Sequence, residues 1–383
     1  MASAATITAT SPGPAEQIST RVAFFIAGFG VAAWAPLVPF AKARADLDEG
    51  TLGLLLLCLG VGSIMAMPAS GALVARFGCR SLIIASSVLM CLTLPLLAVV
   101  SNFALLGVTL LVFGAGLGIL DCVINIQAVI VERASGRTMM SGFHGLFSVG
   151  GVAGSAGVAA LLSLGASPLL AALFVVACIA ALLVYAAPAL LPHGAQGGGP
   201  TFAIPRGIVL FIGILCFIVF LAEGAMLDWS AVFLTSVRGV DPSQAGLGYT
   251  AFAATMTLGR LTGDWIVPRL GHQRVILFGG LLAGGGLALA TLVPHWFAGL
   301  AGYALVGAGC SNIVPVLYTA VGRQKTMPEN VAVPAISTLG YAGILAGPAV
   351  IGFAAHATSL SVALLGLAGL LVAVALSGRF LRA

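Results

Sequence analysis

Three polar side chains stand inside apolar sequence in the first half of the chain. Asp121 and Asn125 are spaced one helical turn apart, and His144 opens the next apolar run. If these runs lie in a lipid bilayer, such groups are costly unless they face a cavity or a partner. A carboxyl group in such a site can bind and release a proton, an imidazole can relay one, and an amide can bind a polar solute. We therefore predict proton coupling by Asp121 and His144 and solute binding by Asn125; hydrogen bonds that only tie helices together are the alternative.

Two further carboxyl groups lie in the second half of the chain. Glu223 is near the centre of an apolar run, and Asp228 follows five positions later. Five positions correspond to about 140° around a helix, so the two acids cannot share a face. We predict that Glu223 carries a coupling proton and that Asp228 contributes to solute binding. Capping or pairing near the outer surface is the alternative for Asp228.

Aromatic and amide side chains are candidates for the wall of a solute site. Planar rings suit a sugar or a flat heterocycle. The predicted solute-binding set is completed by Trp34, Trp229, Asn312 and Tyr341. For each of them, ordinary packing or a place in the aromatic belt at the membrane interface is the alternative.

Arg260 and Asp264 are four positions apart, which is the spacing of an ion pair on a helix surface. We expect both residues near the inner end of their span, where Arg260 is too distant to reach Glu223 or Asp228. Together with Arg76, Arg80 and Arg269 from two inner loops, they are predicted to form a cytoplasmic gate. Direct solute binding by Arg260 is the alternative.

The composition explains why polar groups are informative here. The chain has 383 residues, of which 60% are hydrophobic and only 7% are charged, against about 25% charged residues in soluble domains. Many apolar runs exceed the roughly 18 residues that mark a membrane-spanning helix. No phosphate-binding loop, metal-ligand spacing or nucleophile beside a base is present. We predict an all-α membrane protein with no cofactor, no metal and no enzymatic activity, in contact with lipid and not with nucleic acid.

The apolar runs predict twelve spans in two sets of six. The expected domains are a disordered cytoplasmic tail at 1–20, an N-terminal six-helix bundle at 21–190, a cytoplasmic linker at 191–205 and a C-terminal six-helix bundle at 206–383. The expected spans are 21–43, 51–73, 80–100, 103–131, 139–164, 167–190, 206–236, 243–266, 272–293, 296–322, 330–356 and 359–380.

Lysine and arginine residues predict the orientation, because cytoplasmic loops carry an excess of them. With the N-terminus inside, the outer side holds only Lys42, Arg44 and Arg238. The inner side then holds twelve basic residues: Arg21, Arg76, Arg80, Arg133, Arg137, Arg206, Arg269, Arg274, Arg323, Lys325, Arg379 and Arg382. Both termini are therefore expected in the cytoplasm, and the net charge of +5 is explained without nucleic acid.

The two halves contain matching sequence motifs. Arg76-Phe-Gly78 and Arg269-Leu-Gly271 follow corresponding spans, Gly114-Ala-Gly116 matches Gly307-Ala-Gly309, and the glycines of the fifth span recur in the eleventh. Internal repeats in a membrane protein indicate a transporter with its site between the halves. Through the two loop motifs the chain resembles the major facilitator superfamily. The stretches 121–127, 144–148 and 223–230 resemble its fucose-permease-like branch. The loop motifs depart from the superfamily pattern in one respect: Ala75 and Pro268 replace the acid that usually precedes the loop arginine.

The resemblance implies a secondary transporter that moves a small polar solute, such as a sugar or a related metabolite, by proton symport. We expect it in the inner membrane of a bacterium, as a monomer with alternating access to its site. A proton-coupled efflux antiporter is the alternative, although the Gly-Pro signature of exporters is absent from the fifth span, where Gly154 precedes Ser155. A membrane sensor would need a signalling domain, and a lipid-modifying enzyme would need a nucleophile beside a base. The sequence shows neither feature.

Overall fold

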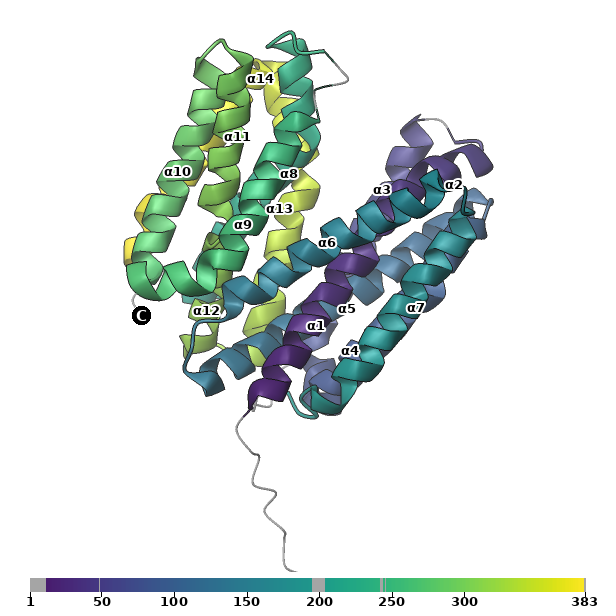
Figure 1. Ribbon diagram of the computed structural model, residues 1–383. Coiled ribbons are helices and arrows are strands. Elements are labelled where there is room, and N and C mark those ends of the chain that lie inside the picture. The colour runs from purple at the N-terminus through teal and green to yellow at the C-terminus, as the bar shows by residue number, and fades with distance from the viewer. Residues whose placement is uncertain (1–11, 48, 195–203, 242–243, 245, 382–383) are drawn as a thin grey trace, which may run out of the picture.

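All secondary structure in the described part of the chain is helical. The computed structural model describes residues 12–47, 49–194, 204–241, 244 and 246–381 (Figure 1). The first half contains α1 (Pro14–Ala32), η1 (Ala35–Leu37), α2 (Val38–Arg44), α3 (Glu49–Ala66), η2 (Met67–Ala69), α4 (Ser70–Val99), α5 (Phe103–Ser135), α6 (Met140–Ser163), α7 (Pro168–Ala186) and η3 (Ala187–Ala189). The second half contains α8 (Ile208–Ser236), α9 (Leu247–Leu270), α10 (His272–Leu292), α11 (Trp296–Cys310), α12 (Ile313–Arg323), α13 (Glu329–Ala357), α14 (Leu360–Ser377) and η4 (Gly378–Phe380).

The helices form two bundles that correspond to the two halves of the sequence. Within the bundles the closest pairings are α1 with α6 and α8 with α13. The bundles lie together where α1 begins, at the bottom of Figure 1, and diverge toward the other end. We call the end where they meet the closed side. Between the bundles, α6 contacts α9, and α12 and α13 contact helices of the first half.

Ten helical stretches in the described residues are long and apolar enough to cross a membrane. One of them, Thr51–Val99, is 49 residues long and includes two of the expected spans. Helix α9 is not among the ten, and it carries Arg260, Asp264 and Arg269. The arrangement is therefore that of a multi-pass membrane protein.

Gly78 divides the long stretch. Its φ of 76° is a left-handed conformation that favours glycine. A side chain there would also overlap the carbonyl oxygen of Pro192. The expected loop at 74–79 is instead part of α4, with the change of direction concentrated at this one residue.

The predicted disordered tail is wrong for residues 14–20, which form the first turns of α1. Pro14 suits the first helical position because it lacks a backbone donor, and the Glu16 carboxylate accepts from the Gly13 amide at 2.7 Å. Thr20 is buried and its hydroxyl accepts from the Gln127 amide at 2.9 Å. These local contacts order a segment that composition alone makes look like a tail. Residues 1–11 lie outside the described residues.

The expected linker at 191–205 is described only at its two ends, since 195–203 lie outside the described residues. Its start is held firmly. Gln127 accepts from the Leu191 amide at 3.1 Å, and Arg80 donates to the carbonyls of Leu190 and Pro188 at 2.9 and 2.6 Å. Gln127 and Arg80 thus attach the end of the first bundle to its own helices.

Candidate functional site

The polar stretch that begins at Asp121 lies on α5 and is buried. Asp121 is 9% exposed, and Asn125 and Gln127 are fully buried. The Asn125 amide donates to the backbone carbonyl of Asp121 at 2.9 Å, while its own side-chain oxygen has no hydrogen-bond partner among the described residues. An unsatisfied buried acceptor is costly. Asn125 is therefore available to a water molecule or a solute.

His144 contacts both halves of the molecule. Its ring lies 5.3 Å from that of Phe24 on α1 and 5.5 Å from that of Tyr318 on α12, measured between centroids. Its Nε2 atom is buried and has no partner within the described part of the chain. The imidazole is thus packed between the bundles with one nitrogen left to bind a further group.

Through the internal repeat, two residues of the second half correspond to Asn125 and His144. Tyr318 follows Asn125 by 193 positions, and Ser337 follows His144 by the same 193. The Tyr318 and Ser337 hydroxyls share a hydrogen bond of 2.6 Å. The glycine repeats of the sequence have this same offset, from Gly114 to Gly307, so the equivalence could have been found without the structure.

Arg260 joins the two bundles at the level of the predicted acids. Its Nη2 atom donates to the two carboxylate oxygens of Glu223 at 3.1 and 3.3 Å. Its Nη1 atom donates to the Ser148 hydroxyl of α6, in the other half, at 3.1 Å. The prediction that Arg260 cannot reach Glu223 is therefore wrong, and so is the expected pairing of Arg260 with Asp264.

Helix geometry explains this difference. Helix α9 continues to Leu270, which moves Arg260 away from the helix end. Long side chains on a helix lean toward its N-terminus. Because α8 and α9 are consecutive and run in opposite directions (Figure 1), the Arg260 and Glu223 side chains lean toward one another.

Asp121 lies apart from this ion pair. The described residues give its carboxyl group no ion pair, whereas Glu223 has one. Its charge would instead act on the phenol groups of Tyr318 and Tyr341, both in the second half. Asp121 of the first half thus lies in electrostatic range of two phenols of the second half.

We call this set of side chains the central layer: Asp121, Asn125, His144, Ser148, Glu223, Arg260, Tyr318 and Tyr341. Four of its members come from α5 and α6, and four come from α8, α9, α12 and α13. The layer contains two acids, Asp121 and Glu223, the cation Arg260, and several hydrogen-bonding groups that include the His144 imidazole. It can therefore bind a polar solute and hold or release a proton.

The other predicted solute-binding residues differ in burial and in contacts. Asp228 is exposed toward the end of α8. The Trp229 ring lies against Gly352 of its own bundle, and Trp34 is 4% exposed. Asn312 stands at the break between α11 and α12, where its amide donates to the Gly259 carbonyl at 2.9 Å. The hydrogen bond of Asn312 ties the helix break to α9 within the second bundle.

The predicted gate residues divide into two groups. Arg80 bonds to its own half, as described above, Arg76 lies over the Phe77 ring, and Arg269 lies over the Trp265 ring. Asp264 instead accepts from the Gly142 amide at 2.9 Å, so it caps the first turn of α6 from the opposite bundle. Of these four, Asp264 is the residue whose hydrogen bond joins the halves.

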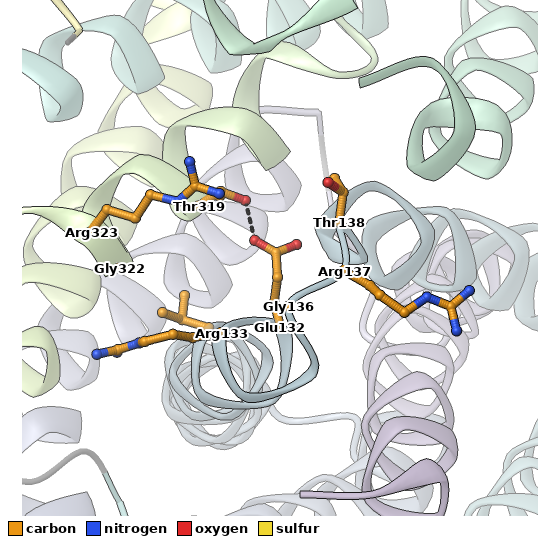
Figure 2. Close-up of a pocket in the computed structure, with 9 residues that line it drawn as sticks. Glu132, Arg133, Gly136, Arg137, Thr138, Thr319, Gly322 and Arg323 are labelled. Atoms are coloured by element: carbon orange, nitrogen blue, oxygen red, sulfur yellow. Dashed lines mark hydrogen bonds between the residues drawn. The ribbon is translucent and has the colours of Figure 1, made fainter. Parts of the chain in front are cut away.

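Contacts that the sequence analysis missed complete the closed side. Glu132 accepts from the amides of Met139 and Met140 at 2.8 and 2.7 Å and from the Thr319 hydroxyl of the other half at 2.6 Å. Figure 2 shows this last bond at the edge of a cavity of about 160 Å³ between α5 and α12. Arg133 also forms an ion pair with Glu329 across the halves. Acidic residues toward the ends of helices on the inner side were the available signal, since the three cross-half ties described here include Glu132, Asp264 and Glu329.

Comparisons with known proteins agree with this architecture. No protein-family model matches the chain. A protein of Yersinia pestis described as an uncharacterized MFS-type transporter is 57% identical over 372 residues, which is 97% of each chain. This chain belongs to the major facilitator superfamily. The prediction made from the loop motifs is confirmed, and because the relatives are transporters the chain is a transporter and not an enzyme.

Two solved structures of the superfamily share the fold. The Escherichia coli fucose:proton symporter FucP superposes with a TM-score of 0.80 at 17% identity, over 96% of this chain and 98% of that one. The proton:xylose symporter XylE superposes with a TM-score of 0.72 at 12% identity, over 96% and 95%. At these identities the likeness concerns the fold alone, and it includes the expected likeness to a fucose permease.

Proposed function

We propose that the protein is a proton symporter for a small polar solute, a sugar or a related metabolite, in the inner membrane of a bacterium. The observation that carries the proposal is Arg260, which holds the Glu223 carboxylate of its own bundle and the Ser148 hydroxyl of the other. A change in the protonation of Glu223 would alter a contact between the two bundles. Proton binding and the movement of the bundles are thereby connected.

The proposal includes twelve membrane crossings with both termini in the cytoplasm. The 49-residue stretch Thr51–Val99 is too long for one crossing of about 20 residues and turns at Gly78, so it supplies two. Helix α9, with 24 residues, supplies the remaining one. It is less apolar because it carries Arg260 and Asp264 at contacts between the bundles. The closed side then faces the cytoplasm, in keeping with the excess of arginine there, including Arg133, Arg137 and Arg323.

Asp121 is the second proposed proton carrier. A buried carboxylate without a cation is unfavourable, so protonation, or hydrogen bonds donated by a bound solute, must offset the cost of burying it. FucP and XylE are described as proton symporters, which supports proton coupling in this fold. The neutral groups Asn125, His144 and Tyr341 are proposed to contact the solute.

Proteoliposomes test the proposal. A panel of labelled sugars and related metabolites is offered with and without an inward proton gradient, and accumulation is compared with exchange at equal pH. Glu223→Gln and Asp121→Asn should retain exchange and lose gradient-driven accumulation. Thr262→Val is a suitable control, since this exposed hydroxyl bonds only within its own helix.

Undiminished accumulation in both acid variants would refute proton coupling through the central layer. If the solute instead moves only away from the side of the vesicle membrane that corresponds to the cytoplasm, in exchange for protons, the protein would be assigned to the efflux antiporters. Both outcomes are read in the same vesicles.

A further inference from the structure

Arg260 is a buried cation, and among the described residues Glu223 is its one ion-pair partner. Its side chain is 9% exposed and pairs with Glu223, whose side chain is 17% exposed. A buried charge whose partner is removed is strongly destabilising. If Glu223 takes up a proton, as in the proposed function, Arg260 therefore needs another anion in the same place.

The guanidinium group has unused capacity for such an anion. Arginine has five N–H donors in a planar fork that matches a carboxylate. Nη1 and Nη2 bond to Ser148 and Glu223, but Nε is buried without a partner among the described residues. A carboxylate that replaced Glu223 could use the donors that Glu223 releases together with the free Nε.

Two other acids on the same helices are placed differently: Asp228 of α8 is exposed, and Asp264 of α9 accepts from the Gly142 amide. Helix α8 packs against α9, α11, α12, α13 and α14. The titratable groups in electrostatic range of Glu223 include Arg260 and Tyr249 on α9, Cys310 on α11 and Cys216 on α8 itself, and Tyr249 is also in range of Asp228. Two more phenols come from α12 and α13: Tyr318, bonded to Ser337, and Tyr341, which lies in electrostatic range of Asp121.

His144 of the other bundle lies in electrostatic range of Arg260. As a neutral imidazole it can accept or donate one hydrogen bond through its free Nε2. Asp121 lies in electrostatic range of Tyr318 and Tyr341, and no ion pair joins it to the guanidinium among the described residues. The region around Arg260 is thus positive once Glu223 is neutral.

We propose that the transported solute carries a carboxylate, which displaces Glu223 from Arg260 when Glu223 binds a proton. This inference rests on the proposed function and deepens it by giving the charge of the solute. The solute anion and the proton enter together, so the central layer keeps the same net charge when empty and when loaded. Glu223 acts as an internal substitute for the solute carboxylate.

The experiment measures binding by the purified full-length protein in lipid nanodiscs. The probes are glucuronate, glucose and glucosamine, which share one ring and differ in charge. Ligands that bind the folded form raise its melting temperature. Glucuronate should raise it more than glucose or glucosamine, and its affinity should increase as pH falls from 8 to 6, by at most about tenfold per pH unit for one linked proton.

Two variants distinguish the mechanism from a structural effect. Glu223→Gln should bind glucuronate equally at pH 6 and pH 8, because Arg260 is free at both. Arg260→Gln should lose the preference for the acid over glucose, whereas Arg260→Lys, which keeps the charge, should retain part of it. Binding of glucose as strong as that of glucuronate, or an unchanged pH dependence in Glu223→Gln, would overturn the inference.

Failure of the inference and failure of the proposed function give different results. A neutral solute that is accumulated with protons would overturn only the inference, and its entry would carry net charge and respond to membrane potential. An acid that binds with the expected pH dependence but shows no proton-driven accumulation would overturn the proposed symport and leave the binding site assigned.

Discussion

The hydrogen bond from Thr319 to Glu132 allows a direct test of how the closed side is held. We consider Thr319→Val, which keeps the shape of the side chain and removes its donor. The bond is 2.6 Å long and buried, and its acceptor is a carboxylate. Hydrogen bonds to charged groups contribute about 1.5–3 kcal/mol. Since α5 and α12 must separate when the closed side opens, this energy stabilises only the closed arrangement.

The expected shift in population follows from that energy. A difference of about 1.4 kcal/mol changes an equilibrium constant tenfold, so Thr319→Val should move the equilibrium toward an arrangement with the closed side open by roughly 10- to 150-fold. The two remaining bonds of Glu132, to Met139 and Met140, lie within the first half and do not oppose opening.

Pulsed electron paramagnetic resonance can measure the shift. Spin labels are placed at Arg137 and Lys325, which are both exposed and lie in different halves. The partly exposed native cysteines, Cys58, Cys91 and Cys178, are replaced first. Thr319→Val should increase the fraction of long distances, while the control Thr262→Val should not. An unchanged distance distribution in Thr319→Val would refute the reasoning.

Three further predictions concern packing and charge. Arg133→Glu should weaken the closed side by no more than about 1 kcal/mol, because Arg133 is 57% exposed, and adding Glu329→Arg should restore the spin-label distances. Gly145→Ala brings a methyl group within 3.2 Å of the Leu261 amide of α9. It should lower the free energy of unfolding by about 1–3 kcal/mol, and it should also reduce the transport rate. Gly157→Ala on the same helix meets nothing within 4 Å and should not. Gln127→Leu should lower the melting temperature, at a cost of about 1–3 kcal/mol for the orphaned Leu191 amide; an unchanged melting curve would contradict its assigned role.

The sequence was informative about residues whose presence is costly. Asp121, Asn125, His144 and Glu223 were singled out because polar groups are rare in apolar runs, and all four lie in or beside the contact between the bundles. It was less informative about which polar groups meet. It did not indicate, for example, that the Asn312 amide donates to the Gly259 carbonyl of α9 at a helix break, because spacing along one helix says nothing about the helix packed beside it.

The predictions for α1 and Arg260 differ from the structure for related reasons. The order of residues 14–20 depends on the bond between Thr20 and Gln127, which are 107 positions apart. The partner of Arg260 depends on the opposite lean of side chains on two adjacent helices. Neither a distant contact nor a mutual orientation is visible in a hydropathy pattern.

The amino-acid sequence by itself determined the class of the protein, the internal repeat and the family, because these follow from composition and from local or repeated patterns. Only the tertiary structure decided that Arg260 pairs with Glu223 and reaches Ser148, and that Glu132, Asp264 and the pair of Arg133 with Glu329, rather than Arg76, Arg80 and Arg269, tie the halves at the closed side. The physical reason is that hydrophobicity acts on each segment separately, whereas hydrogen bonds and ion pairs require two groups within about 3 Å, and the chain brings those groups together only when its bundles pack.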